Sequence, residues 1–221
     1  MSLLQRAYGR LLHVGFRLLY NELAWAYDGV SWGVSLGQWR AWQRASLPHL
    51  TGPRVLEIAF GTGNLQVDLH AAGQETFGID LSSHMVHITS RKLRRRRIMG
   101  RLCRASAGAL PFATASFDSL VATFPTPFIR DRRVLFEMAR VLRSDGHLII
   151  VDGAWLLQPH WAARAIEWLD RATGQGPGAG PPSQLWLEQA GWRATERMEA
   201  NSRAVVHLIV ADPPVRLPGE G

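Results

Sequence analysis

The sequence predicts an α/β protein built on a parallel sheet, and three observations lead to this prediction. Short apolar runs alternate with segments in which apolar residues recur at helical spacing. The run at residues 55–58 turns sharply through glycines into one of these segments. Asp80 ends the next run, at the strand end where open parallel sheets bind ligands. We therefore expect alternating strands and helices, with a ligand site at the carboxyl edge of the sheet.

The stretch 55–64 is predicted to be a strand, a tight turn and the start of a helix. It reads Val-Leu-Glu-Ile-Ala-Phe-Gly-Thr-Gly-Asn. Gly61 and Gly63 lack a Cβ atom, so the backbone can take positive φ and approach a ligand closely. Asp80 follows Gly63 by 17 residues, and a carboxylate at that strand end can accept two hydrogen bonds from a ribose diol. Together these features indicate a nucleoside-containing cofactor.

The glycine spacing distinguishes between two candidate cofactors, a dinucleotide and S-adenosylmethionine. A dinucleotide site requires Gly-x-Gly-x-x-Gly/Ala, which places a pyrophosphate on the helix N-terminus. Here Gly63 is followed by Asn64, Leu65 and Gln66, so the third small residue is missing. S-adenosylmethionine carries no phosphate and needs only the turn and the ribose carboxylate. The sequence favours S-adenosylmethionine.

Residues 55–64 and 78–82 resemble the first two motifs of the class I methyltransferases, which depend on S-adenosylmethionine. Leu-Pro-Phe at 110–112 with Ser-Phe-Asp at 116–118, and the stretch 142–151, are similar to the small-molecule branch that contains the ubiquinone/menaquinone-biosynthesis methyltransferases. This resemblance implies a Rossmann-like fold. It consists of a seven-stranded, mostly parallel sheet with an antiparallel last strand, helices on both faces and an N-terminal helical cap.

The resemblance also implies the cofactor-binding residues. Glu57 would lie near the methionine amino group, and Asp80 would bind the ribose hydroxyls. The full set implied is Glu57, Ala59, Phe60, Gly61, Thr62, Gly63, Asp80, Leu81, Ser106, Ala107 and Phe124.

Two positions depart from the family pattern. Ala59 and Phe60 stand where Gly-Cys is usual, and alanine disfavours positive φ, so we expect a reshaped turn. Ser106 stands where an aspartate usually binds the adenine amino group, so we expect altered adenine recognition.

The segments before the first strand are predicted to be helical. Residues 1–20 form an amphipathic, basic helix that packs on the core or a dimer partner, or else rests on a membrane surface. Residues 20–44 are rich in aromatic side chains, and the resemblance makes them a cover over the cofactor and part of the substrate pocket, with Tyr27 as a pocket candidate. We therefore divide the chain into a cap, residues 1–50, and a methyltransferase domain, residues 51–213.

The alternation continues after Asp80. Ser82 is a predicted N-cap, with Leu81, Met85 and Ile88 on one helical face, and Asp131 is a second N-cap. The predicted strands are 101–105, 119–123 and 147–152, followed by a hairpin of 193–200 and 203–211. The predicted helices end at 97, 144–146, 169 and 190, and a Gly/Pro connector occupies 173–182.

The net charge of +7 and the pI near 10.8 raise the question of nucleic acid. The densest basic run, residues 91–97, falls in the last turns of a predicted helix, where cations favour the negative helix end. A solvated helix end is the simpler interpretation, and an RNA or phospholipid patch is the alternative. No aromatic residues interleave with the run to stack bases, so nucleic acid is disfavoured as a partner.

The single cysteine, Cys103, excludes a disulfide within the chain and disfavours a metal cluster, so no metal site is predicted. No segment has some 18 uninterrupted apolar residues. We expect a cytoplasmic protein that is either a monomer or a homodimer. The alternative is a protein that contacts a membrane surface peripherally through residues 1–20.

The resemblance implies methyl transfer to a small, hydrophobic or aromatic acceptor. Positioning and exclusion of water can supply most of the rate, without a metal or a covalent intermediate. His160 is the candidate general base, because it follows the fifth strand and can be neutral near pH 7. Residues 124–128 superficially resemble the motif of amino-group DNA methyltransferases but lack its leading carboxamide or carboxylate. Two alternatives stay open: a cofactor-binding protein without catalysis, and an RNA methyltransferase that docks through its arginines.

Overall fold

The computed structural model describes residues 35, 37–157 and 183–215. Their seven strands form one sheet in the order β3-β2-β1-β4-β5-β7-β6. The strands are β1 (Arg54–Ile58), β2 (Glu75–Asp80), β3 (Arg101–Arg104), β4 (Phe117–Thr123), β5 (Leu142–Leu156), β6 (Arg193–Ala200) and β7 (Ala204–Asp212). β7 runs antiparallel to both β5 and β6, and the pairs among β1 to β5 are parallel. The predicted Rossmann-like sheet with an antiparallel last strand is confirmed.

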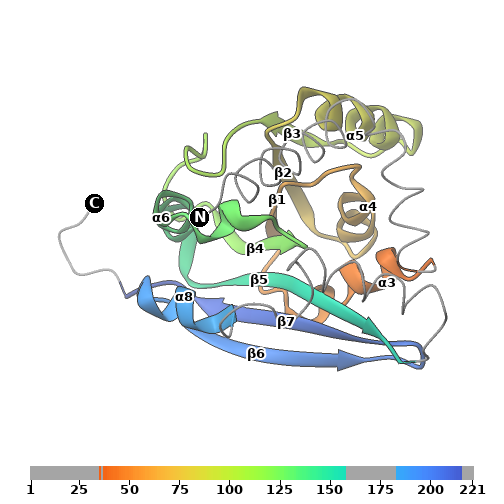
Figure 1. The fold of residues 1–221 in the computed structure, drawn as a ribbon. Coiled ribbons are helices and arrows are strands. Elements are labelled where there is room, and N and C mark those ends of the chain that lie inside the picture. The colour runs from red at the N-terminus through yellow and green to blue at the C-terminus, as the bar shows by residue number, and fades with distance from the viewer. Residues whose placement is uncertain (1–34, 36, 158–182, 216–221) are drawn as a thin grey trace, which may run out of the picture.

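Helices cover both faces of this sheet (Figure 1). They are α3 (Trp39–Arg44), α4 (Asn64–Ala71), α5 (Ser83–Arg95), α6 (Arg132–Val141) and α8 (Ser183–Gln189), with 3-10 turns η1 (Leu47–His49) and η2 (Pro127–Arg130). Successive side chains of a strand point to opposite faces. Val55 of β1 therefore packs with Leu65 and Leu69 of α4, whereas its neighbour Leu56 packs with Met138 of α6. The central strands β1 and β4 are buried on both sides, as parallel strands covered by helices on both faces require.

The parallel strands bring their carboxyl ends to one edge of the sheet. Ile58 of β1 is level with Ile79 of β2 and with Ala122 of β4. Asp80, the last residue of β2, is level with Arg104 at the end of β3. The turn after β1, Asp80 and the residues that follow β3 and β4 are thus collected from distant parts of the sequence.

The boundary between α6 and β5 differs from the prediction. The sequence suggested a helix to residues 144–146, but α6 ends at Val141 and Leu142 is already extended, with ψ of 141°. Leu142 pairs with Phe117 of β4, and the Arg143 guanidinium lies 2.6 Å from Asp118 Oδ1. These contacts with β4 draw the chain into the sheet earlier than its helical periodicity indicated.

Both predicted N-caps are confirmed. The Ser82 hydroxyl accepts from the Met85 N–H at 3.4 Å, and the Asp131 carboxylate accepts from the Arg133 N–H at 2.8 Å. The prediction that Leu81 shares a helical face with Met85 and Ile88 is wrong, because α5 begins only at Ser83. The Leu81 side chain is 68% exposed and precedes α5, whose buried residues are Met85, Thr89 and Leu93.

Two predicted elements, the helix at 159–169 and the connector at 173–182, lie outside the described residues, as does the helix at 1–20. None of the helices in the described part of the chain combines the length and apolar character needed to cross a bilayer.

Candidate functional site

Asp80 and the glycine turn are held together by hydrogen bonds at the carboxyl edge of the sheet. Asp80 Oδ2 accepts from the Gly61 N–H at 2.9 Å, and Oδ1 accepts from the Ser82 N–H at 2.8 Å. Burial raises the pKa of this carboxyl, and the backbone donors, among them Ser82 and Gly61, oppose that rise. Each carboxylate oxygen can accept more than one hydrogen bond, so acceptor capacity remains for a diol. The turn and the carboxylate therefore form one hydrogen-bonded unit.

Ala59 overturns the expectation of a reshaped turn. Its φ is 57°, so this alanine takes the left-handed conformation that a glycine would adopt at the same position. The next residue is fixed, because the Phe60 N–H donates to the Ile79 carbonyl at 3.2 Å and the Phe60 ring is buried. Left-handed backbone costs an alanine roughly 1 kcal/mol, and the surrounding contacts offset that cost. Phe124, at the end of β4, is also left-handed, with φ of 48°.

Helix α5 supports the turn from behind. The Thr89 hydroxyl donates to the Gly61 carbonyl at 2.8 Å. A Cβ atom on Gly63, whose φ is 72°, would lie 2.2 Å from Thr89 Cγ2, so only glycine fits there. At Gly61, by contrast, a Cβ atom would meet no atom of the described residues within 4 Å. The turn is thus rigid on the α5 side and open at Gly61, where a ligand can approach the backbone.

Glu57 is fully buried behind the turn. The Gln66 side-chain amide of α4 donates to Glu57 Oε2 at 2.8 Å, and Glu57 Oε1 has no partner among the described residues. Burial raises the pKa of Glu57 to about 8, the Gln66 hydrogen bond opposes the rise, and the nearby carboxylates Asp80 and Asp68 add to it. Burial thus favours the protonated form of Glu57.

The two residues expected to frame adenine flank Asp80. Leu81 exposes its side chain, and Ser106 lies just beyond the end of β3, where the Ala105 N–H donates to the Asp80 carbonyl at 3.1 Å. The Ser106 hydroxyl accepts from the Gly108 N–H at 3.2 Å. The serine thus closes a local turn, and its O–H and second lone pair can still form hydrogen bonds to a ligand. Ala107 is half-buried beside it.

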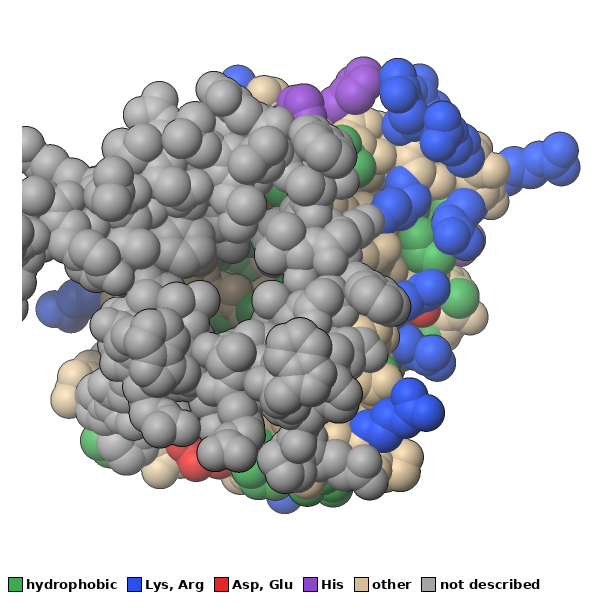
Figure 2. Space-filling view, turned by 45° about the vertical axis from the view of Figure 1, so that its right-hand side comes forward, with side chains coloured by type: hydrophobic (Ala, Val, Ile, Leu, Met, Phe, Trp, Pro, Cys, Tyr) green, Lys and Arg blue, Asp and Glu red, His purple; other side chains and the backbone are tan. Residues whose placement is uncertain are grey.

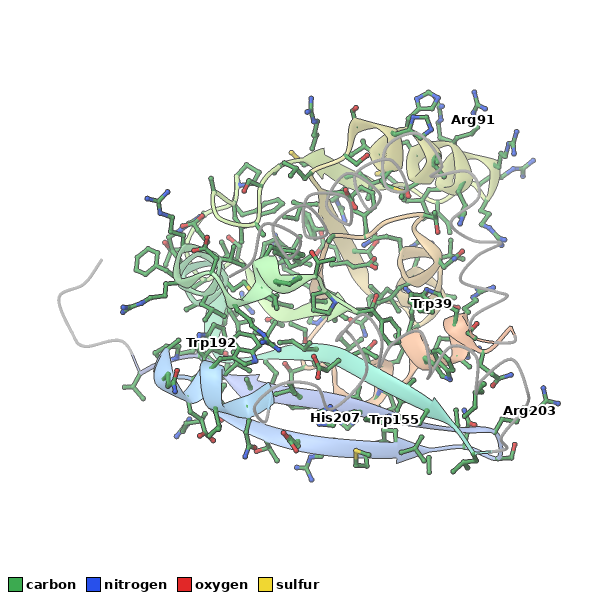
Figure 3. All side chains as sticks on the ribbon, in the orientation of Figure 1. Trp39, Arg91, Trp155, Trp192, Arg203 and His207 are labelled. Carbon is green, nitrogen blue, oxygen red and sulfur yellow. The ribbon has the colours of Figure 1, made fainter. Side chains whose placement is uncertain are left out.

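Sequence reasoning missed Gln43. Its side-chain amide donates to the Thr123 hydroxyl at 3.0 Å, its Oε1 is buried without a partner among the described residues, and it lies on α3 next to Trp42. Trp39, on the same helix (Figure 3), stacks on Phe124 with ring centroids 4.3 Å apart. The aromatic density of residues 20–44 pointed to this helix, but no sequence pattern pairs a residue at 43 with one at 123.

The turn and α3 enclose a small pocket of about 30 Å³. Its lining residues are Trp39, Gln43, Ala59, Phe60, Gly61, Thr62 and Thr123. The volume is about that of one water molecule, so this pocket alone is too small for a cofactor. The other predicted cofactor residues lie outside it, namely Glu57, Gly63, Asp80, Leu81, Ser106, Ala107 and Phe124. A larger hollow of about 520 Å³ lies along α5 and β3, and none of the predicted site residues that the structure describes lines it.

Two predicted catalytic residues cannot be placed, since Tyr27 and His160 lie outside the described residues. In the described part of the chain, no group of three or more His, Cys, Asp and Glu side chains is arranged to hold a metal ion.

Comparison with known families identifies the central part of the chain. Residues 56–150 match the family described as "Methyltransferase domain". This range contains the glycine turn, Asp80, Ser106 and Phe124. The resemblance to class I methyltransferases is thereby confirmed for these residues.

The relatives include the quinone-biosynthesis methyltransferases. A ubiquinone/menaquinone biosynthesis C-methyltransferase of Geotalea uraniireducens is 31% identical over 143 residues, which are 61% of this chain and 61% of that protein. The chain thus spans about three fifths of this relative's length.

Solved structures share the fold. A Methanococcus maripaludis protein matches with a TM-score of 0.65 and 14% identity, over 90% of this chain and 96% of that one. The geranyl diphosphate C-methyltransferase of Streptomyces coelicolor, solved with S-adenosyl-L-homocysteine, has a TM-score of 0.55 and 15% identity, over 78% of this chain and 76% of that one.

Proposed function

We propose that this chain, whose residues 56–150 form a class I methyltransferase domain, transfers a methyl group from S-adenosylmethionine to a small acceptor with an apolar ring. The observation that carries the proposal is the Asp80 carboxylate, which binds the backbone of the glycine turn through one oxygen and the start of α5 through the other. A ribose diol that reaches this carboxylate also reaches the turn. The ubiquinone/menaquinone methyltransferase similar to this chain makes a quinone precursor our first choice of acceptor.

The described residues fit S-adenosylmethionine. Asp80 has acceptor capacity for the ribose hydroxyls, and the backbone is open at Gly61. Leu81 exposes 68% of an apolar side chain next to Asp80, which a flat base would cover. Adenine recognition at Ser106 would use a hydroxyl in place of a carboxylate. No third glycine or alanine prepares the helix start for a pyrophosphate, in agreement with a cofactor that carries no phosphate.

The chain's own part in the reaction is to position the reactants. S-adenosylmethionine, when bound, supplies an electrophilic methyl group on a sulfonium. The Ala59–Gly63 backbone would hold the methionine and ribose, and Asp80 would fix the ribose orientation. Trp39, stacked on Phe124, closes the site beside the turn and excludes water. In-line placement of two reactants and a dry site are enough for a large rate gain.

The acceptor pocket is proposed to start at the aromatic cluster of Trp39, Trp42 and Phe124, whose ring centroids lie 4.3 to 6.2 Å apart. An apolar ring gains roughly 25 cal/mol for each Å² of surface removed from water. Gln43, with an unpartnered oxygen at this place, could accept a hydrogen bond from a polar group on the cofactor or the acceptor. We keep residues 1–50 as a cap over a domain of residues 51–213.

Several finer roles are proposals that rest on the sequence alone. His160 is the candidate general base and Tyr27 a pocket residue. Residues 1–20 are proposed to touch a membrane surface peripherally, on a cytoplasmic protein that is a monomer or a homodimer.

The test is calorimetric titration of the full chain with S-adenosylmethionine, S-adenosylhomocysteine and NADH. We expect both sulfur ligands to bind with micromolar dissociation constants and NADH not to saturate. Incubation with methyl-labelled S-adenosylmethionine and a set of ring-containing apolar acceptors should then give a labelled product. Binding of NADH in preference to both sulfur ligands would contradict the proposal.

The same experiment separates the alternatives. Binding of S-adenosylmethionine without transfer to any acceptor would favour a cofactor-binding protein, and transfer to RNA would favour an RNA methyltransferase. The relatives favour neither alternative, since the first of them is named as a ubiquinone/menaquinone biosynthesis C-methyltransferase.

A further inference from the structure

The positive charge of this protein is concentrated in one segment. Residues 81–104 contain eight of the 25 Lys and Arg residues and no Asp or Glu. The other 197 residues therefore carry 17 basic and 18 acidic side chains, a balance close to zero. The net charge of +7 therefore lies on this one segment, which consists of α5, β3 and the loops beside them.

Five arginines of this segment point into solvent. Arg91 and the arginines at 94–97 are exposed, and in the described residues no acidic side chain pairs with them. Arg101, by contrast, pairs with Glu75 at 3.1 Å, and the Arg104 guanidinium donates to the Leu81 carbonyl at 3.1 Å. Figure 2 shows Lys and Arg side chains gathered along one edge of the molecule, and Figure 3 shows Arg91 directed away from α5.

An exposed apolar side chain lies next to these arginines. Met99 is 80% exposed in the loop that follows the four arginines. That loop begins at Arg97, whose φ of 58° is the left-handed conformation that usually ends a helix on glycine. An arginine is held there in spite of the strain that its Cβ atom causes. We call Arg91, the arginines at 94–97 and Met99 the arginine face.

A hollow of about 520 Å³ adjoins the arginine face, between α5 and the edge strand β3. Its apolar lining comes from Val86, Leu93, Ile98 and Leu102, and Arg94 lies at its rim with His87 and Ser90. These arginines pair with no acidic side chain in the described part of the chain, and they lie beside an exposed methionine and a hollow with both polar and apolar lining. This combination matches the two layers of a membrane surface, anionic headgroups over acyl chains.

We propose that the arginine face binds a membrane surface rich in anionic phospholipids, with Met99 inserted among the headgroups. RNA is the competing partner for such a charge, but residues 81–104 contain no Phe, Tyr or Trp on which bases could stack. The inference stands apart from the proposed methyl transfer, since none of its residues belongs to the cofactor site.

The test is flotation of the full chain with vesicles of phosphatidylcholine alone and of phosphatidylcholine with about 30% phosphatidylglycerol, at about 0.1 M NaCl. We expect binding to the mixed vesicles only. Replacing the four arginines at 94–97 by glutamine should lower the partition coefficient roughly a hundredfold, at about fivefold for each arginine with some loss of additivity. Met99→Ser should lower it roughly threefold to tenfold, by removal of apolar contact.

The matched control removes four other exposed arginines, Arg130, Arg132, Arg133 and Arg197, with the same change of net charge. We expect this variant to bind the mixed vesicles within about threefold of the parent, since only charges near the bilayer contribute. Thermal melting of all variants should stay within a few degrees, because the replaced side chains are exposed.

Three results would overturn the proposal. They are equal binding to phosphatidylcholine alone, equal losses in the two fourfold variants, and unchanged binding after both the fourfold replacement at 94–97 and Met99→Ser. Retention of vesicle binding in those variants would assign it to another segment, such as residues 1–20. Tight, salt-resistant binding of a defined RNA that the 94–97 variant loses would identify the face as a nucleic-acid site instead. Cofactor titration of the same variants reports on the proposed function separately.

Discussion

At the scale of single residues, two buried carboxyl groups lie near the turn in different surroundings. Asp80 faces the site and accepts two backbone hydrogen bonds. Glu57 lies behind the turn with one oxygen unpartnered in the described structure. Burial raises the pKa of both groups, but backbone donors favour the charged form of Asp80. Asp80 is therefore suited to bind a ligand, whereas Glu57 affects the stability of the fold.

Asp80→Ala should weaken the binding of S-adenosylmethionine about 10-fold to more than 100-fold. Loss of hydrogen bonds to a charged group typically costs about 1.5 to 3 kcal/mol. Titration calorimetry measures the change. Asp131→Ala is the control, because Asp131 also accepts from a backbone N–H, at the start of α6, but lies away from the site. An Asp80→Ala protein that folds and keeps its dissociation constant would rule out the ribose role.

Glu57 should make stability fall as the pH rises from about 5 to 8. The folded protein holds the Glu57 proton up to a pKa of about 8, whereas a free glutamate loses it near 4.5. Between these values the folded state binds more protons, so the free energy of unfolding decreases by up to about 1.4 kcal/mol per pH unit. This contribution is complete below the lower pKa and is lost above the higher one.

Urea denaturation of the parent and of Glu57→Gln at several pH values isolates this effect. The variant should gain stability relative to the parent as the pH rises, since it has no carboxyl to ionise. Glu188→Gln, on the exposed side of α8, is the control. A parent and a Glu57→Gln variant with parallel pH profiles would show that the Glu57 pKa is not raised.

At the scale of elements, the turn between β1 and α4 and the loop before β4 are both fixed by side chains of a helix. Thr89 of α5 holds the turn at Gly61. Arg140 of α6 donates to the carbonyls of Leu110 and Phe112, and Glu137 accepts from the Leu110 N–H at 2.7 Å. The Leu-Pro-Phe motif that the sequence presented is thus a loop clamped by α6.

Gly61→Ala should reduce cofactor affinity far more than stability. The new Cβ atom meets no atom of the described residues, so we expect a cost to the fold of only left-handed strain, roughly 1 kcal/mol, whereas the methyl group occupies space at the ligand-facing turn. Gly73→Ala is the matched control, with φ of 82° and the same absence of neighbours, outside the site. Thermal melting and titration together measure the two effects. Equal affinity in the two variants would place the ligand elsewhere.

Arg140→Gln should lower the free energy of unfolding by about 2 kcal/mol. The replacement removes the hydrogen bonds of Arg140 to two carbonyls and its ion pair with Glu137. The Arg140 hydrogen bond also holds the pKa of Glu137 below its usual range. Urea unfolding provides the measurement. Arg132→Gln, also on α6 but exposed, should change stability by less than about 0.5 kcal/mol. Similar values for both variants would mean that the clamp contributes little.

At the scale of the whole molecule, the proposed cofactor and acceptor residues meet at the carboxyl edge of the sheet, since Trp39 and Gln43 line one pocket with turn residues 59–62. The basic charge lies elsewhere, on α5 and its loop. The arginine face can therefore be altered without change to the proposed cofactor site.

Deletion of residues 1–20 should leave S-adenosylmethionine binding within about threefold and reduce vesicle association or dimer formation. The cofactor contacts proposed here all come from residues after Trp39, and a basic amphipathic helix adds surface affinity. Titration, vesicle flotation and analytical ultracentrifugation report the three properties. A truncated protein that fails to fold would show that the segment belongs to the core.

The amino-acid sequence determined the features that depend on neighbouring residues. The strand, turn and helix at residues 55–64, the N-caps at Ser82 and Asp131, and the place of Asp80 at a strand end follow from local backbone preferences and from the rule that parallel strands end at one edge. The order of the strands followed from the resemblance carried by those motifs.

Only the tertiary structure decided which distant residues meet. Gln43 and Thr123 are 80 positions apart in sequence, and packing of α3 on the end of β4 brings them within 3.0 Å. The left-handed Ala59 contradicts its intrinsic preference, because fixed neighbours outweigh roughly 1 kcal/mol of strain. The arginine run was visible in sequence, but its exposure beside Met99 and a surface hollow was not. Local backbone preferences carry small free energies, so tertiary contacts determine the conformation wherever the two conflict.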